Sequence, residues 1–327
     1  MNYSKELKTF LSKAAKTEKL RIPKYVHFYD DNKVEIITTR EEVRFTLPEN
    51  HELNGMNITL DSLLNVNKVW KTFAVVNNGN EVFATNGKGK RTLTTNNDKI
   101  VPRQEFIYYK ELPIQVYEEF MLASNFISSD ETRYFMNGVL IDGDLTVVAT
   151  DGRRLYRAEV DGEPTDIPTI IAASKVLEKI DPVHLYLTKD GLFIDCITEE
   201  YFLCKINGQF PNYKRVIPDS KEYVPITLPK DLSITEIKKF MKVDKINRMR
   251  VDNTKIGYTE NSSDILVYEE PYNFECDVPF NIAIDVNYFE NFLTYLDSNK
   301  LMYTAPNKAI YMIDKHRMII VMPMQQD

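Results

Sequence analysis

Apolar and polar positions along the chain follow two different rhythms. In six segments the apolar side chains recur every three or four residues, which is the pattern of a helix that buries one face. These helices are expected to begin near Ser4, Leu60, Pro113, Ala172, Ser233 and Asp285. Between them lie alternating runs rich in β-branched and aromatic residues, which predict strands. The strands are expected over residues 25–29, 33–39, 42–47, 134–141, 145–150, 155–160, 184–188, 201–206 and 308–313.

The spacing of the expected helices predicts an internal repeat. The helices that begin near Leu60, Ala172 and Asp285 start 112 and 113 residues apart, and one further helix precedes each of them. Three domains follow, over residues 1–103, 104–220 and 221–327. Turn dipeptides such as Asp142-Gly143 and Asp190-Gly191 join successive strands. Strands joined by tight turns are antiparallel, so we expect an α+β fold rather than a doubly wound α/β fold.

Composition fits this size and class. With 327 residues, 43% of them hydrophobic and 27% charged, the chain resembles an ordinary soluble globular protein with more than one core. It has no apolar stretch of about 18 residues for a membrane span, and its first residues lack the apolar centre of a signal peptide, so a cytoplasmic protein is expected. The net charge of −7 argues against a chain that coats nucleic acid through bulk positive charge. It leaves room for a basic surface on one face.

Lysines follow the polar faces of several expected helices. Residues at i, i+4 and i+7 lie on one side of a helix. A lysine stripe on a single helix is most often only a solvated face, but its recurrence in all three thirds of an acidic chain favours a tunnel for a phosphate backbone, held without reading the bases. The lysines expected to face DNA are Lys5, Lys8, Lys16, Lys19, Lys175, Lys179, Lys238, Lys242 and Lys245.

Signals for catalysis are weak. Residues 87–92 (GKGKRT) suggest a phosphate-binding loop, but the earlier glycine that such a loop needs falls at Ala84. A solvated turn, or a basic hairpin tip that touches DNA, remains open for this segment. The four histidines are far apart, and none stands in a nucleophile motif. Cys196, Cys204 and Cys276 have no zinc-ligand spacing and are expected to be reduced and buried. We therefore expect no catalytic residue, no metal site and no cofactor.

Three separate segments carry the most specific signal. They are residues 149–155 (ATDGRRL), 210–218 (FPNYKRVIP) and 319–324 (IIVMPM). The last of them keeps the chain apolar almost to its final residue, and such a tail must be held by other parts of the protein. Together the segments resemble the bacterial DNA polymerase III beta subunit, the sliding clamp. That family builds its partner-binding pocket from a threonine-aspartate-glycine-x-arginine-leucine loop, a phenylalanine-proline-x-tyrosine turn and a methionine-proline-methionine end.

The resemblance implies an architecture and a pocket. The fold would consist of three similar clamp domains, each with two helices and antiparallel sheets, and two chains would form a ring as a head-to-tail homodimer. In the pocket, flexible methionines would provide an adaptable apolar cleft, and Arg154 and Arg215 would bond peptide carbonyl groups. The implied pocket residues are Met136, Thr150, Gly152, Arg153, Arg154, Leu155, Pro211, Arg215, Val216, Ile320, Val321, Met322, Pro323 and Met324.

The resemblance also implies a function. The protein would be a non-enzymatic processivity factor that encircles double-stranded DNA independently of sequence. Its partners would be the DNA polymerase catalytic subunit, a clamp loader and other proteins with clamp-binding peptide motifs. Two alternatives stay open at this point: a clamp-fold adaptor that binds peptides without encircling DNA, and a nucleotide-dependent enzyme that uses residues 87–92.

Overall fold

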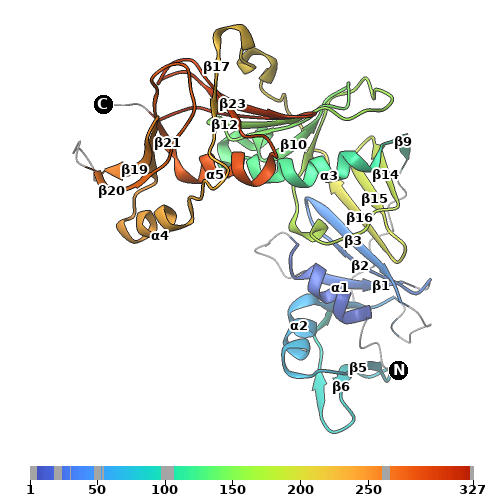
Figure 1. The fold of residues 1–327 in the computed structure, drawn as a ribbon. Helices are drawn as coiled ribbons and strands as arrows, with labels where there is room; N and C mark the ends of the chain where they lie inside the picture. Colours follow the sequence, from blue (N-terminus) through green and yellow to red (C-terminus); the bar gives the residue numbers. More distant parts are fainter. Residues whose placement is uncertain are drawn as a thin grey trace. The chain divides into compact units, whose positions relative to one another are not determined.

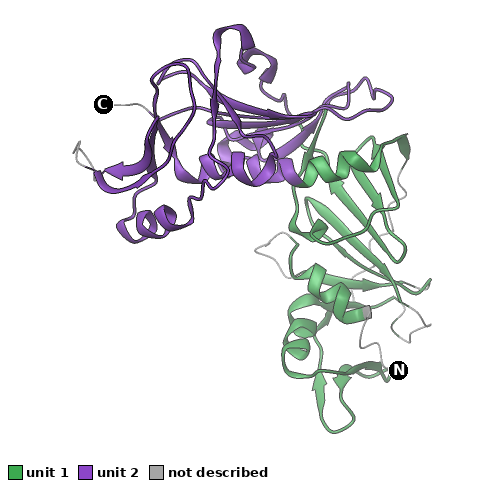
Figure 2. Cartoon of the chain, in the orientation of Figure 1, with its two compact units in different colours: residues 1–121, 169–207 green, residues 122–168, 208–327 purple. Residues whose placement is uncertain are grey.

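The chain divides into two compact units. The structure is a computed structural model, and it describes residues 6–17, 24–29, 31–47, 53, 55–96, 107–259 and 266–324. Unit 1 contains Met1–Met121 and Thr169–Asn207, and unit 2 contains Leu122–Pro168 and Gly208–Asp327 (Figure 2). The helices and strands of both units are labelled in Figure 1.

Unit 1 is built on a long antiparallel sheet. Its strands follow the order β8-β4-β1-β2-β3-β16-β15-β14-β9. A smaller sheet has the order β5-β6-β7. The strands of the unit are β1 (Tyr25–Phe28), β2 (Lys33–Ile37), β3 (Glu41–Thr46), β4 (Asn57–Thr59), β5 (Ala74–Asn77), β6 (Val82–Thr85), β7 (Lys90–Thr92), β8 (Thr95–Asn96), β9 (Tyr108–Glu111), β13 (Thr169–Ala172), β14 (His184–Thr188), β15 (Gly191–Asp195) and β16 (Glu199–Cys204).

Unit 2 contains two further antiparallel arrays. One follows the order β10-β11-β12-β24-β23-β22-β17 and the other β20-β19-β18-β21. The C-terminal strand β24 therefore lies between β12 and β23, which confirms that the apolar tail is held by other parts of the protein. The strands are β10 (Gly138–Ile141), β11 (Val147–Thr150), β12 (Arg154–Ala158), β17 (Val224–Thr227), β18 (Arg248–Asp252), β19 (Lys255–Thr259), β20 (Leu266–Pro271), β21 (Asn281–Asp285), β22 (Lys300–Tyr303), β23 (Ile310–Asp314) and β24 (Arg317–Val321).

Five of the six expected helices are present. They are α1 (Glu6–Ala14), α2 (Leu60–Val69), α3 (Ile114–Ala123), α4 (Thr235–Asp244) and α5 (Val286–Tyr295). Each buries apolar side chains on one face, although Leu293, expected on the buried face of α5, is exposed. On α1, for example, Phe10 is fully buried and meets Phe45 of β3 edge to face, with ring centroids 5.5 Å apart. Burial of such faces, rather than helix propensity, supplies most of the stability of short helices.

The helix expected from Ala172 is wrong. The strand β13 ends there, and only the 3₁₀ turn η3 (Lys175–Leu177) follows. Val176 and Leu177 are both buried in this turn, and Lys179 adopts a left-handed backbone with φ 60°, which a helix cannot continue through. Pro182 lies three residues further on, so a helix has no room to continue. The strand expected over residues 134–141 is also shorter, because η2 (Glu131–Met136) occupies its first part.

The order of elements repeats three times. Each repeat runs helix, four strands, a helix or 3₁₀ turn, and three strands: β1 to β7 around α2, β10 to β16 around η3, and β18 to β24 around α5. The sheets, however, join strands of successive repeats, because β16 pairs with β3 and β24 pairs with β12. The two boundaries between the three expected domains stay a prediction, and the boundary at residues 101–103 lies outside the described residues.

Candidate functional site

The loop between β11 and β12 is fixed by its own side chains. The carboxylate Oδ1 of Asp151 accepts hydrogen bonds from the backbone N–H groups of Arg153 at 2.9 Å and Arg154 at 3.0 Å. Gly152 has φ 89°, a left-handed conformation that favours glycine, and its N–H donates to Oγ1 of Thr150 at 3.0 Å. The threonine-aspartate-glycine sequence thus forms a rigid turn at the start of β12.

A second segment lies across the sheet of unit 2 and is fastened at two points. In η4 (Tyr213–Val216), the hydroxyl of Tyr213 donates to Oδ2 of Asp142 at 2.7 Å, and Lys214 Nζ lies 3.1 Å from the same oxygen. Burial alone would raise the pKa of Asp142, but the hydrogen bonds from Tyr213 and Lys214 outweigh it and lower that pKa. Further along, the ring of Tyr223 meets Tyr311 of β23 at 4.9 Å. The segment therefore forms a firm wall above β12, β24 and β23.

A cavity of about 570 Å³ lies between this wall and the sheet. Its volume falls in the range of sites that bind drug-sized ligands or peptide side chains. Eleven of the fourteen residues implied by the resemblance line it: Met136, Thr150, Gly152, Arg153, Arg154, Leu155, Pro211, Arg215, Val216, Ile320 and Met322. Segments that are more than 160 residues apart in the sequence meet here because Leu155 pairs with Ile320.

The structure places the other three implied residues elsewhere. Val321 is fully buried on the face of β24 opposite to Ile320, because successive side chains of a strand point to opposite faces. Pro323 and Met324 do not line the cavity, and the N–H of Met324 donates to the carbonyl oxygen of Ala283 on β21 at 2.7 Å. The tail beyond Met322 is thus held against β21.

Arg154 has a role that the sequence did not indicate. Its Nε donates to Oδ2 of Asp151 at 2.9 Å, and its NH2 group donates to the carbonyl oxygen of Asn125 at 2.8 Å. The guanidinium lies 4.9 Å from the centre of the Phe126 ring and 4.8 Å from that of Tyr288. These contacts direct the side chain into the protein, so Arg154 stabilises the loop. Of the three arginines at the cavity, Arg153 and Arg215 are the exposed ones.

Half of the cavity lining was not predicted. The additional residues come from the later part of the segment above the sheet and from the turn between β22 and β23: Asn212, Tyr213, Ile217, Pro218, Asp219, Glu222, Tyr223, Thr304, Asn307, Lys308 and Ala309. Four of them, Asn212, Tyr213, Ile217 and Pro218, belong to the motif segment already noted. The contribution of the turn could not be predicted from the sequence, because only the pairing of Ile310 with Val321 brings the turn beside the tail.

The expected DNA-facing lysines have different surroundings. Lys5 and Lys19 lie outside the described residues. Lys16 Nζ pairs with Glu178 at 3.0 Å, and Lys238 Nζ pairs with Glu290 of α5 at 2.6 Å. Lys175 and Lys179 are exposed but share no helix face, because the helix is absent. Lys8 is half-buried on α1, Lys242 is exposed on α4, and Lys245 is the exposed residue that ends α4.

Two other sequence interpretations are now decided. Residues 87–89 lie in the turn between β6 and β7, and residues 90–92 form β7; in the turn, Oδ1 of Asn86 accepts hydrogen bonds from the N–H groups of Lys88 and Gly89. A phosphate loop leads into a helix, so that interpretation is wrong. The three cysteines are free, as expected, but half-buried. Within the described part of the chain, no group of three His, Cys, Asp or Glu side chains is arranged to hold a metal ion, and no helix there is both long and apolar enough to cross a membrane.

Comparison with known proteins gives partial matches in sequence and complete ones in structure. No family model matches the chain. The beta sliding clamp of Treponema pallidum is 41% identical over 111 residues, which are 29% of each chain. That of Caulobacter vibrioides is 31% identical over 123 residues, 32% of this chain and 33% of the relative. The matched part therefore spans only about a third of these relatives.

The structural matches extend over the whole chain. The DNA polymerase III beta subunit of Pseudomonas aeruginosa superposes with a TM-score of 0.78 at 17% identity, over 100% of this chain and 99% of that one. The beta subunit of Thermotoga maritima gives 0.76 at 18% identity, over 98% of both. The chain has the sliding-clamp fold. The resemblance and the fold class inferred from the sequence are thereby confirmed.

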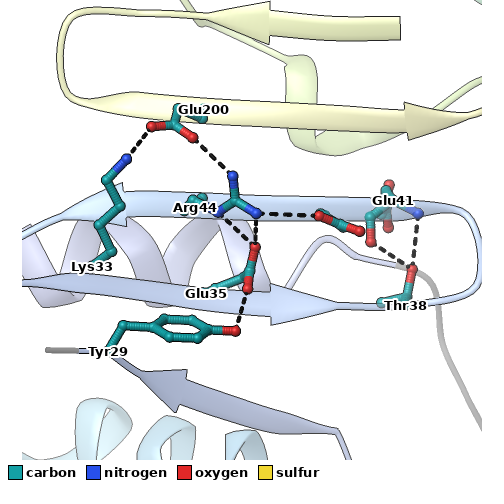
Figure 3. A network of polar contacts seen from close by, with 8 residues as sticks. Tyr29, Lys33, Glu35, Thr38, Glu41, Arg44 and Glu200 are labelled. Carbon is teal, nitrogen blue, oxygen red and sulfur yellow. Dashed lines mark hydrogen bonds and ion pairs between the residues drawn. The ribbon is translucent and has the colours of Figure 1, made fainter. Parts of the chain in front are cut away.

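Within this clamp fold the two junctions between repeats differ in chemistry. At the junction of β12 with β24, the apolar side chains of Leu155 and Ile320 line the cavity. At the corresponding junction of β3 with β16, one of the five pairs is Arg44 with Glu200, and Lys33 and Glu35 contact these two side chains (Figure 3). Apolar partner side chains therefore have a suitable surface at the junction in unit 2.

Proposed function

We propose that the protein is a DNA sliding clamp. It would act as a non-enzymatic processivity factor, encircle duplex DNA as a head-to-tail homodimer, and tether the polymerase catalytic subunit and other partners through a peptide bound in the cavity of unit 2. A clamp loader would open the ring and place it on DNA. The observation that carries the proposal is the cavity itself, which three distant motif segments form together on a clamp fold.

The lining of the cavity suits a peptide with apolar anchors. Leu155, Ile320 and Met322 offer apolar surface, and methionine adapts its shape to different ligands. Arg153 and Arg215 at the cavity are exposed and can donate hydrogen bonds to carbonyl groups of a bound peptide. A few apolar side chains in a desolvated pocket commonly supply most of the affinity of such an interaction.

The charge pattern favours retention of DNA by topology rather than by affinity. The chain carries a net charge of −7, and two of the expected lysines, Lys16 and Lys238, are paired with glutamates. Few phosphate contacts form at once under these conditions, so binding to a short linear duplex should be weak and sensitive to salt. A closed ring needs no strong contact to stay on DNA.

The test compares circular and linear DNA. The protein is loaded onto a nicked circular plasmid by an ATP-driven clamp loader, and the bound fraction is measured after gel filtration at moderate salt. Retention on the circle and loss after cutting it with a restriction enzyme are expected. Equal retention on both forms would contradict a ring that encircles DNA.

The paired lysines give the adaptor alternative a specific basis. Pairing of Lys16 with Glu178 and of Lys238 with Glu290, and the absence of the helix expected near Ala172, all reduce the basic surface that faces a duplex. An adaptor that binds peptides without encircling DNA has no need to dimerise. Sedimentation distinguishes the two, because the adaptor would remain a monomer of 38.1 kDa and the clamp would have twice that mass.

A further inference from the structure

The cavity of unit 2 runs along one end of its sheet. Neighbouring strands are antiparallel, so the start of β12, the end of β24, the start of β23 and the end of β22 follow one another at that end. Each contributes to the lining, with Arg153 before β12, Met322 after β24, Ala309 before β23 and Thr304 after β22. Adjacent strands are about 4.8 Å apart, so the cavity is about 14 Å long, which an extended peptide spans with about four residues.

The wall above the sheet reaches the β23 end of the cavity with the 3₁₀ turn η5 (Ser220–Glu222). Asp219 caps this turn, because its Oδ1 accepts a backbone hydrogen bond from the turn at 3.1 Å. Tyr223 follows, and its ring meets that of Tyr311 on β23 at 4.9 Å. Burial raises the pKa of Tyr311, and Tyr223 and Asp219 raise it further, which agrees with a carboxylate near β23. Asp219 and Glu222 therefore belong to the end of the cavity that lies away from β12.

The two ends of the cavity carry opposite charge. Arg153 is exposed at the β12 end. At the β23 end, Asp219 and Glu222 are exposed and line the cavity together with Lys308, so two carboxylates stand against one ammonium group. Among the residues that the structure describes, neither of these carboxylates has an ion-pair partner. A ligand can therefore supply the missing positive charge.

The β23 end also has the groups that suit a guanidinium. The ring of Tyr223 lines the cavity beside the two carboxylates, and Thr304 and Asn307 add side-chain oxygens. A guanidinium stacks on an aromatic ring and donates hydrogen bonds to carboxylates in one plane. We propose that this end of the cavity binds a basic side chain of the partner peptide, arginine above all. The inference rests on the proposed function for the peptide itself, and it adds that partners are selected by a basic residue beside their apolar anchors.

The apolar anchors and the basic residue occupy different parts of the cavity. Leu155 and Ile320 pair with each other on β12 and β24, so an anchor that packs on them lies towards the β12 end. Asp219 and Glu222 are exposed, and contacts of an exposed cation with a carboxylate or an aromatic ring are weak. The arginine should therefore strengthen binding about 3- to 10-fold, and salt should reduce this gain. Such a gain selects between partners more than it sets the affinity.

The test adds one arginine to either end of a peptide. The parent peptide carries a glutamine followed by spaced leucine and phenylalanine, has blocked termini, and is compared by isothermal titration calorimetry with versions that carry arginine at the first or the last position. One version should bind about 3- to 10-fold tighter than the parent peptide, because its arginine reaches η5. The other should gain nothing, because its arginine lies near Arg153.

Two substitutions assign the gain to the carboxylates. Asp219→Asn with Glu222→Gln keeps an oxygen that can cap η5 and removes both negative charges. This variant should bind the parent peptide as tightly as before and lose the gain from arginine. Asp219→Lys with Glu222→Lys should invert the preference, so that glutamate at the same peptide position binds tighter than arginine.

A matched control separates the local contact from the charge of the whole protein. Asp161→Asn with Glu275→Gln makes the same charge change on exposed residues of unit 2 that do not line the cavity, and it should keep the gain. Circular dichroism melting checks that each variant is folded. If neither arginine peptide binds tighter, or if the gain persists without the two carboxylates, or if the control loses it equally, this inference is overturned while binding of the parent peptide still supports the cavity. If the folded protein binds none of the peptides, the peptide site of the proposed function is overturned as well.

Discussion

Arg44 of β3 donates a hydrogen bond from Nε to Oε1 of Glu35 on β2 at 2.6 Å, and the two side chains are 4% and 0% exposed (Figure 3). The same guanidinium reaches Glu200 of β16 at 3.0 Å, which links the first and second repeats across their shared sheet. Glu42 lies 3.5 Å from Arg44 as well. Three carboxylates thus share one buried arginine, and its removal leaves them without their main counter-charge.

Arg44→Met should therefore destabilise unit 1 strongly. Breaking a buried ion pair from one side costs about 3–5 kcal/mol, because the remaining charge is desolvated and unpaired. Urea denaturation followed by circular dichroism measures the loss. Lys33→Met is the matched control, since Lys33 pairs with the same Glu200 but lies nearer the surface. An Arg44→Met protein as stable as the control would show that the network contributes little.

Glu42 should make stability depend on pH near neutrality. Burial raises its pKa to about 7 from 4.5, with a further contribution from Glu35 that Arg44 opposes. Between these two pH values the folded protein keeps a proton that the unfolded chain has released. The contribution of this protonation to the free energy of unfolding is fully present below pH 4.5 and is lost as pH rises through 7. The loss amounts to about 3 kcal/mol.

Glu42→Gln should remove this dependence, because the amide has no proton to lose. Its melting temperature should exceed that of the parent at pH 8 and approach it at pH 5. Glu41→Gln, on the neighbouring residue of β3, serves as the comparison. If the difference between Glu42→Gln and the parent is the same at both values of pH, Glu42 does not titrate in this range.

The sequence predicted what depends on local pattern. Periodicity located five helices, and the apolar tail indicated a segment held by other parts of the protein, which the structure shows as the strand β24. The failures depend on tertiary context. Buried Val176 and Leu177 suit a helix or a turn equally well until the left-handed backbone at Lys179 is known. The motif that named Val321 as a pocket residue carries no information on which face of β24 points to the cavity.

The hydrogen bond from Tyr213 to Asp142 should hold η4 in place as one wall of the cavity. Tyr213→Phe keeps the ring, which is only 5% exposed, and removes the hydroxyl that donates at 2.7 Å. Loss of a hydrogen bond to a charged acceptor costs about 1.5–3 kcal/mol. A looser wall should weaken peptide binding several-fold, mainly through faster dissociation in surface plasmon resonance. Tyr117→Phe is the control, because it removes a comparable bond to the carbonyl oxygen of Leu177 in unit 1. Equal dissociation rates for the two variants would show that the Tyr213 hydroxyl does not position the wall of the cavity.

The cavity and the tail allow a sharper comparison between two methionines. Met322 lines the cavity, whereas Met324 does not, and the backbone N–H of Met324 is bonded to the carbonyl oxygen of Ala283. With a short peptide that carries a glutamine followed by spaced leucine and phenylalanine, Met322→Ala should cost about 1–3 kcal/mol of affinity, and Leu155→Ala a similar amount. Met324→Ala should change the affinity much less.

Deletion of residues 322–327 extends this test to the whole tail. The deletion removes Met322 from the cavity and frees Ala283 from its bond to Met324, so peptide binding should fall below that of Met322→Ala. Isothermal titration calorimetry on the full set gives the order of effects, and sedimentation checks that the assembly is retained. A truncated protein that binds the peptide as tightly as the parent would show that the cavity in unit 2 is not where the peptide binds, whatever the outcome of the ring experiments.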